Sequence, residues 1–203
     1  DIRDNTATAR TVATLANLIV KKLKTVAVAI PGSTIVINDT TTNNGQVSAG
    51  ASVTRFYLST DSTFDGGDTF LDERSIPPLA AKASSSGSTT VTIDSGTALG
   101  AYILIAVADA TNVVAETNNN NKKTQKLTVT RPDLSVSSVK SPSSAAAGST
   151  IVVQDTTSNQ APVPAGASTT RFYLSVDALL DGGDVPLDPL VLGRAVPPLA
   201  AKA

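Results

Sequence analysis

Two observations predict an all-β fold built from repeated β-sandwich domains. Apolar and polar residues alternate in short runs, as they do in strands with one buried face, and turn-forming residues separate these runs. In addition, residues 32–61 recur as residues 148–177 with 21 of 30 positions identical, 116 residues further along the chain. A repeat of this length has the size of one β-sandwich domain, whereas the units of solenoid proteins have about 20–50 residues.

The two copies predict how the 203 residues divide into domains. The similarity resumes between residues 76–83 and residues 196–203 at an offset of 120, so the second copy carries a four-residue insertion around Pro189–Gly193. We therefore predict three parts: the last strand of a preceding repeat at 1–15, a complete repeat at 16–131, and a partial second repeat at 132–203 that lacks its final strands. Either the chain is a piece of a longer array, or strands are shared between subunits, as in donor-strand fibres.

The first strand of the complete repeat lies within residues 11–24, a stretch whose composition also tolerates a helix. Leu18–Val20 aligns with Leu134–Val136 of the second copy, and we predict strands at both places. In the next strand Ile35 and Ile37 share one face, and this strand follows a Pro-Gly turn.

The later strands show the same alternation. Phe56 and Leu58 share the buried face of their strand, with Arg55 and Tyr57 on the opposite face. The remaining predicted strands carry apolar residues two positions apart: Val91 and Ile93; Ile103, Ile105 and Val107; Leu127 and Val129. About seven strands, enriched in the Thr, Val and Ile that pleated sheets favour, predict an immunoglobulin-like sandwich.

The composition excludes several classes of function. The chain has no Cys, Met, Trp or His, 3% aromatic residues and a net charge of −1. Disulfides, the usual zinc, copper and haem sites, and His-dependent nucleophiles are therefore excluded. The near-neutral charge without a basic run predicts no nucleic-acid partner, and the short apolar runs predict no membrane insertion. We predict that the protein is not an enzyme.

Several motifs together resemble the CARDB family, the cell adhesion related domain found in bacteria. These motifs are Thr54–Asp61, Phe64–Asp68, Gly100–Leu104, Ala108–Asn112 and Glu116–Asn118. The resemblance covers residues 17–130 fully and 133–203 in part. It implies an immunoglobulin-like sandwich of secreted or surface-bound prokaryotic proteins, often in tandem and without catalytic residues.

An acidic loop is the first candidate site. Its Asp61, Thr63, Asp65, Gly66 and Asp72 fall at positions 1, 3, 5, 6 and 12 of the EF-hand spacing, and calcium prefers such oxygen ligands. In the second copy a leucine replaces the oxygen of position 3. The hypothesis is bound calcium as the cofactor, with seven carboxylates as its ligands: Asp61, Asp65, Asp68, Asp72, Asp177, Asp181 and Asp184. The alternative is a strand-connecting turn, in which Asp and Gly are favoured for backbone reasons alone.

Two further groups are weaker candidates. The group of Asp109, Asn112, Glu116 and Asn118 supplies either oxygen ligands or partners for backbone groups at a strand end. Arg55 and Arg171 each lie mid-strand near a Tyr, where a cation–π contact or a ligand-binding role is one interpretation. A solvent-facing residue that discourages pairing between sheets is the other.

These observations predict a non-catalytic structural or adhesive module of an extracellular tandem-repeat protein, such as a stalk, adhesin or filament subunit, secreted by or displayed on a prokaryotic cell. Its expected partners are neighbouring repeats or identical subunits, joined by strand or end-to-end packing, and cell-surface or carbohydrate ligands. One alternative is an accessory spacer or carbohydrate-binding part of a secreted hydrolase. Another is a self-assembling fibre subunit that shares β-strands between chains.

Overall fold

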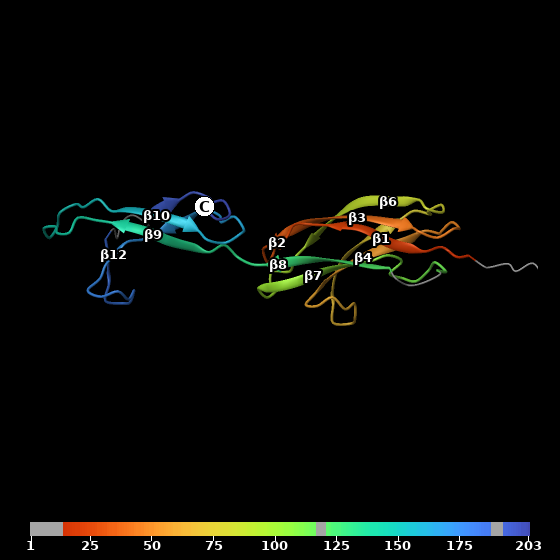
Figure 1. The fold of residues 1–203 in the computed structure, drawn as a ribbon. Coiled ribbons are helices and arrows are strands. Elements are labelled where there is room, and N and C mark those ends of the chain that lie inside the picture. The colour runs from red at the N-terminus through yellow and green to blue at the C-terminus, as the bar shows by residue number, and fades with distance from the viewer. Residues whose placement is uncertain (1–13, 117–120, 188–192) are drawn as a thin grey trace, which may run out of the picture. The chain divides into compact units, whose positions relative to one another are not determined.

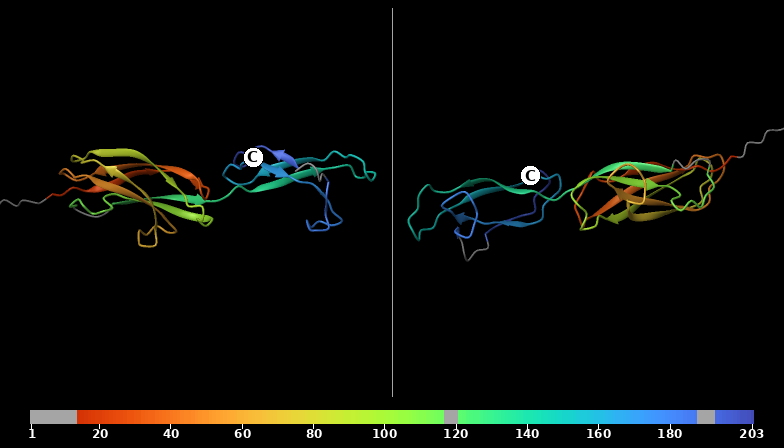
Figure 2. Two further views of the ribbon diagram at one scale, coloured as in Figure 1. Left: turned by 180° about the vertical axis from the view of Figure 1, so that it is seen from behind. Right: turned by 90° about the horizontal axis from the view of Figure 1, so that it is seen from below.

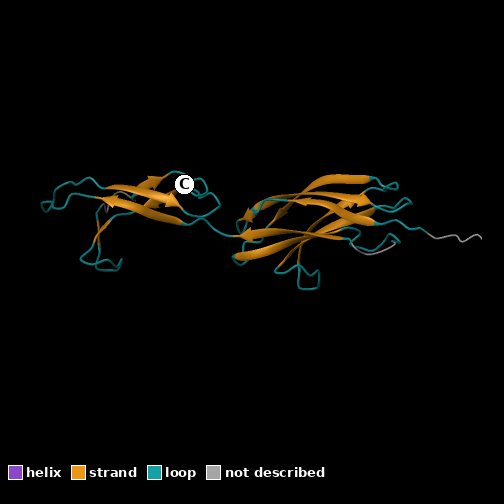
Figure 3. Ribbon diagram, in the orientation of Figure 1, coloured by secondary structure: helices purple, strands orange, loops and turns teal. Residues whose placement is uncertain are grey.

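The computed structural model describes residues 14–116, 121–187 and 193–203, and these residues form strands, turns and loops without a helix (Figures 1 and 3). The predicted all-β class is confirmed for this part of the chain. The chain divides into two compact units, Asp1–Val129 and Thr130–Ala203. The strand predicted at 1–15 lies almost entirely outside the described residues.

The first unit contains two sheets that face each other (Figures 1 and 2). The three-stranded sheet has the order β1 (Leu18–Lys24), β3 (Thr34–Asn43), β6 (Ser84–Thr92). The five-stranded sheet has the order β2 (Val28–Ala29), β8 (Lys122–Val129), β7 (Gly100–Val107), β4 (Ser52–Ser59), β5 (Thr69–Ile76). Neighbouring strands are antiparallel except β2 and β8, which are parallel.

The described part of this unit has eight strands, whereas the sequence predicts about seven. The additional strand is β2, which forms because the chain changes sheets after β1. At the crossing, the N–H of Thr25 donates to Gln125 Oε1 at 3.1 Å. Gln125 Nε2 in turn donates to the carbonyl of Thr25 at 3.0 Å. These paired bonds hold the crossing against β8 and allow the two-residue strand β2 to form.

One apolar face of each sheet lines a common core, as the alternation predicts. The predicted core residues found there are Ile35, Ile37, Phe56, Leu58, Val91, Ile93, Leu127 and Val129. For β7 the predicted face is wrong, because Leu104 and Ala106 face the core instead. Ile105 is also fully buried, but on the other face of the sheet, opposite Tyr57. This central strand is covered on both faces, so its alternation does not identify the core side.

A buried asparagine fixes the end of β3. Asn43 is fully buried, and its Nδ2 donates to the carbonyls of Val47 at 2.8 Å and Leu79 at 3.1 Å. Its Oδ1 accepts from the N–H groups of Asn17 at 3.1 Å and Gly45 at 3.0 Å. One side chain thereby joins the segment before β1, the loop after β3 and the loop after β5.

An ion pair connects the two sheets. Arg74 of β5 donates from Nε to Asp39 Oδ1 at 2.7 Å and from Nη2 to Asp39 Oδ2 at 2.6 Å. Its Nη1 also donates to the hydroxyl of Ser85 on β6 at 3.0 Å. The side chain of Asp39 is fully covered and that of Arg74 is 13% exposed, so the carboxylate of this bidentate pair is withdrawn from water and the guanidinium largely so.

The second unit contains three two-stranded pairings. β9 (Leu134–Lys140) pairs with β10 (Gln154–Asn159), β11 (Ser168–Thr170) with β14 (Arg194–Val196), and β12 (Tyr173–Leu174) with β13 (Val185–Pro186). Aligned by sequence, these strands correspond to β1, β3, β4 and β5. Among the described residues of this unit no strand corresponds to β6, β7 or β8. The predicted insertion lies largely outside the described residues.

Polar anchors recur in the second unit at the aligned positions. Asn159, buried like Asn43, donates to the carbonyls of Val163 at 2.7 Å and Ala200 at 2.9 Å. Arg194 forms a bidentate ion pair with Asp155, as Arg74 does with its aspartate. No local sequence pattern predicts these anchors, although each is identical in the two copies.

Candidate functional site

The loop between β4 and β5 protrudes from the first unit (Figure 1). It carries Asp61, Asp65 and Asp68, three of the seven carboxylates that the sequence predicts as calcium ligands. Asp61 Oδ1 accepts from the N–H of Thr63 at 2.6 Å, and Asp65 Oδ1 accepts from the N–H of Gly67 at 2.8 Å. Asp68 Oδ2 accepts from the N–H of Asp65 at 3.0 Å. The carboxylates thus fold the loop by binding its own backbone, which is how Asp stabilises turns.

The second unit repeats this arrangement between β12 and β13. Asp177 Oδ1 and Asp181 Oδ1 each accept from the N–H two residues further on, both at 2.7 Å. Asp184 Oδ2 accepts from the N–H of Asp181 at 2.8 Å. The pKa of Asp184 lies below its ordinary value because the Ser175 hydroxyl and this amide stabilise the charged carboxylate.

Asp72, the predicted ligand at position 12, lies on β5, and its Oδ1 accepts from the N–H of Glu73 at 2.8 Å. Within the described ranges, no three Asp, Glu, His or Cys side chains are grouped so that they could hold a metal ion. The loop carboxylates therefore have backbone partners in this structure, and the calcium hypothesis stays a prediction.

The second candidate group begins directly after β7. Asp109 is buried and accepts from the N–H groups of Val113 at 3.2 Å and Val114 at 2.9 Å. Asn112 has a φ of 52° and donates its N–H to the carbonyl of Asp109 at 2.8 Å, so it forms part of the turn. Asn118 lies outside the described residues. Asp109 thus satisfies backbone groups at a strand end, one of the two roles that the sequence predicts.

Glu116 fastens this loop to the first strand. Its Oε1 accepts from the N–H of Leu18, and its Oε2 accepts from Asn121 Nδ2 at 2.6 Å. The pKa of Glu116 is raised, chiefly because burial disfavours the charged carboxylate. The nearby Asp109 charge raises this pKa further, whereas the two hydrogen bonds lower it.

Replacing Glu116 by glutamine is expected to change how the stability of the first unit depends on pH. Because the folded state raises this pKa, the proton on Glu116 stabilises the fold below the ordinary pKa of 4.5, and this contribution is lost as the pH rises through the folded-state pKa. The urea midpoint of the wild type, relative to that of E116Q, should therefore rise on acidification from neutral pH and level off below 4.5. A constant or falling difference would contradict the role assigned to burial.

Aromatic side chains gather on the outer face of the five-stranded sheet. The ring of Tyr57 lies 4.8 Å from that of Phe64 and 5.7 Å from that of Phe70, measured between ring centroids. Arg55 Cζ lies 5.7 Å from the Phe70 centroid, and its Nε donates to Glu73 Oε2 at 2.8 Å. The pKa of this guanidinium is raised, mainly by its hydrogen bond to Glu73. We call these five residues the aromatic patch. The cation–π partner of Arg55 is Phe70, whereas the sequence predicts a tyrosine.

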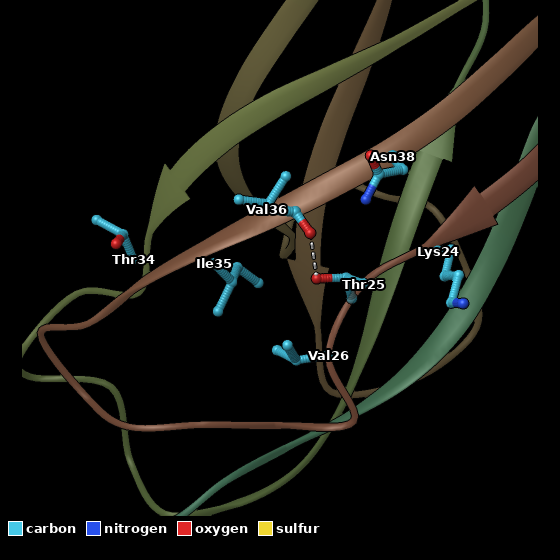
Figure 4. Close-up of a pocket in the computed structure, with 7 residues that line it drawn as sticks. All are labelled: Lys24, Thr25, Val26, Thr34, Ile35, Val36 and Asn38. Carbon is cyan, nitrogen blue, oxygen red and sulfur yellow. Dashed lines mark hydrogen bonds between the residues drawn. The ribbon is translucent and has the colours of Figure 1, made fainter.

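An open hollow of about 650 Å³ lies between the end of β1 and the start of β3 (Figure 4). Val26, Ile35 and Val36 provide its apolar lining, and Lys24 is its one charged residue. The hydroxyl of Thr25 donates to the carbonyl of Val36 at 2.9 Å, so this threonine fastens the end of β1 to β3. The seven lining residues include no carboxylate, and the hollow therefore holds no acid–base pair.

In the described part of the chain, no helix has the length and apolar character needed to span a bilayer.

Comparison with known proteins identifies one family. The sequence model of the CARDB family matches residues 15–126, more than half of the chain. No curated protein matches the chain.

Among solved structures, the CARDB domain of the PF1109 protein from Pyrococcus furiosus, in complex with di-metal ions, is 20% identical with a TM-score of 0.46, over 60% of this chain and 95% of that one. A solution structure of the same domain is 22% identical with a TM-score of 0.45, over 58% of this chain and 97% of that one. A β-glucosidase from Erythrobacter marinus is 11% identical with a TM-score of 0.42, over 57% of this chain and only 16% of the enzyme.

Proposed function

Because the chain belongs to the CARDB family, we propose that it is a non-catalytic module of an extracellular tandem-repeat protein of a prokaryote. In this proposal the immunoglobulin-like sandwiches form a stalk, adhesin or filament. They determine how far it extends from the cell and present a surface for adhesion. Neighbouring repeats or identical subunits, and cell-surface ligands, are its partners.

One observation carries this proposal: buried polar side chains that hold the fold together recur in both units. The buried asparagines Asn43 and Asn159 occupy aligned positions, and so do the two ion pairs, Asp39 with Arg74 and Asp155 with Arg194. Each anchor binds backbone or a partner strand. An array of similar domains needs such anchors in every copy, whereas a catalytic role would need reactive groups gathered around a cleft.

An adhesion assay tests the proposal. Beads coated with the 203-residue chain should adhere to cells or surface polymers of the source environment, and beads coated with heat-unfolded chain should not. The same chain should release no reducing sugar from soluble polysaccharides. Release of sugar, or equal adhesion of the folded and unfolded chains, would contradict a folded, non-catalytic adhesive module. Release of sugar by the parent protein but not by this chain would favour the accessory-hydrolase alternative.

The calcium interpretation of the acidic loops is a separate proposal. Binding would require Asp65 and Asp181 to turn from backbone N–H groups to the ion. Calorimetric titration with calcium chloride should then release or absorb heat with the wild type and not with the D65N/D181N variant. Absence of heat with the wild type would assign the loops to turn formation alone.

A further inference from the structure

We propose that the aromatic patch of the first unit binds a neutral glycan. The inference rests on the proposed adhesive function and names the ligand class and the site. Phe64 and Phe70 are 41% and 52% exposed and flank Tyr57, and the ion pair of Arg55 with Glu73 adjoins them. Aromatic rings bury a large apolar area when a ligand covers them, and the ion pair beside them offers polar partners.

The fold of the loop does not require its exposed rings. In the second unit the positions of Phe64 and Phe70 carry Leu180 and Pro186. Even so, that loop keeps the same pattern of carboxylate-to-backbone hydrogen bonds, with distances of 2.7 to 2.8 Å. The hydrogen bonds of the loop therefore do not depend on these phenylalanines. Both rings contact Tyr57, and the exposed part of each, 41% for Phe64 and 52% for Phe70, can contact a ligand.

The patch is held in place before any ligand arrives. Tyr57 lies directly opposite the buried Ile105 on the neighbouring strand, so it covers the outer face of the sheet. The loop that bears Phe64 is fixed by its own turns and by Lys122, whose Nζ donates to the carbonyl of Ser62 at 3.0 Å. A preformed surface loses little conformational entropy on binding, which favours a small ligand.

The chemistry of the patch fits a sugar. The flat rings offer apolar contact for the C–H face of a pyranose. Arg55 donates its Nε–H to Glu73 and has further guanidinium N–H groups that can donate to a ligand. The Glu73 carboxylate can accept hydrogen bonds, so a donor and an acceptor lie next to each other for neighbouring sugar hydroxyls. The two charges cancel, which favours an uncharged ligand. Three rings and one ion pair are also far fewer than the about 20–30 residues that a stable protein interface uses on each side.

Calorimetry with defined oligosaccharides tests this proposal. The probes are three neutral sugars, cellohexaose, mannohexaose and chitohexaose, and one acidic sugar, a heparin hexasaccharide. At least one neutral probe should bind the wild type at millimolar concentration, and the F64A/F70A variant should bind it at least about tenfold more weakly. F64L, which introduces the residue of the second unit and so suits the loop, should weaken binding as well. The control L99A removes an apolar side chain that is 54% exposed outside the patch and should bind like the wild type.

Three outcomes would overturn the proposal: no binding of any neutral probe, equal binding by the wild type and F64A/F70A, or preference for the heparin fragment. A protein partner would be indicated if F64A/F70A abolished bead adhesion while no sugar bound and enzymatic deglycosylation of the target surface had no effect. Equal adhesion by the wild type and F64A/F70A would contradict a role of the aromatic patch in adhesion, but it would not contradict the proposed adhesive function.

Discussion

Replacing Arg74 by leucine is expected to lower the free energy of unfolding of the first unit by about 3–5 kcal/mol. The substitution leaves the carboxylate of Asp39, 3% exposed, without its bidentate partner and inside the unit. Hydrogen exchange of the β3 and β5 amides in urea, followed by mass spectrometry on the full chain, measures this loss separately from the second unit. A loss below about 1 kcal/mol would show that water reaches the carboxylate and that the pair belongs to the surface.

The chain provides a matched control for this experiment. The ion pair of Arg55 with Glu73 lies on the surface, because these side chains are 35% and 41% exposed, against 13% for Arg74 and 0% for Asp39. R55L should therefore cost at most about 1 kcal/mol. The double variant D39L/R74L should regain much of the stability lost in R74L, because it removes the buried charge together with its partner.

Replacing Asn43 by alanine is expected to cost the first unit about 3 kcal/mol, because several buried groups lose their partner at once. The carbonyls of Val47 and Leu79 and the N–H groups of Asn17 and Gly45 all bond to this one side chain. The loss should appear first as faster hydrogen exchange around these segments and then as a lower urea midpoint.

Asn44 provides the control, since it is exposed and adjacent in sequence. N44A should change the free energy of unfolding by less than about 0.5 kcal/mol. If N43A and N44A had similar effects, the buried asparagine would not be the anchor that the structure indicates. N159A in the second unit should loosen the loop around Val163 and Ala200, because these carbonyls accept from Asn159.

Alternation in the sequence predicts much of the first unit, because most strands have one buried face. Ile35 and Ile37 on β3 and Phe56 and Leu58 on β4 all line the core as predicted. The same rule fails on β7, where Ile105 is buried on the opposite side of the sheet from Leu104. A strand buried on both faces carries apolar residues at every position, so alternation cannot identify its inner side.

Pairings between distant residues are harder to predict from one sequence. Asp39 and Arg74 lie 35 residues apart, and neither has a local pattern that predicts burial. The repeat holds a usable signal, since both residues recur in the second copy as Asp155 and Arg194. For the acidic loop, the spacing of the carboxylates suits an ion and a turn equally well, and only the hydrogen bonds show that the backbone N–H groups occupy them in this structure. The aromatic patch depends on β4–β5 pairing, which brings Tyr57 opposite Phe70.

The proposal of an extracellular tandem array is tested most directly by the intact mass of the native protein. An antibody against this chain should capture the protein from washed cell surfaces or culture fluid, and its mass is then measured under denaturing conditions. The account predicts capture from these fractions and a mass well above the 20.6 kDa of these 203 residues. A protein of about 20.6 kDa found only inside the cells would contradict it.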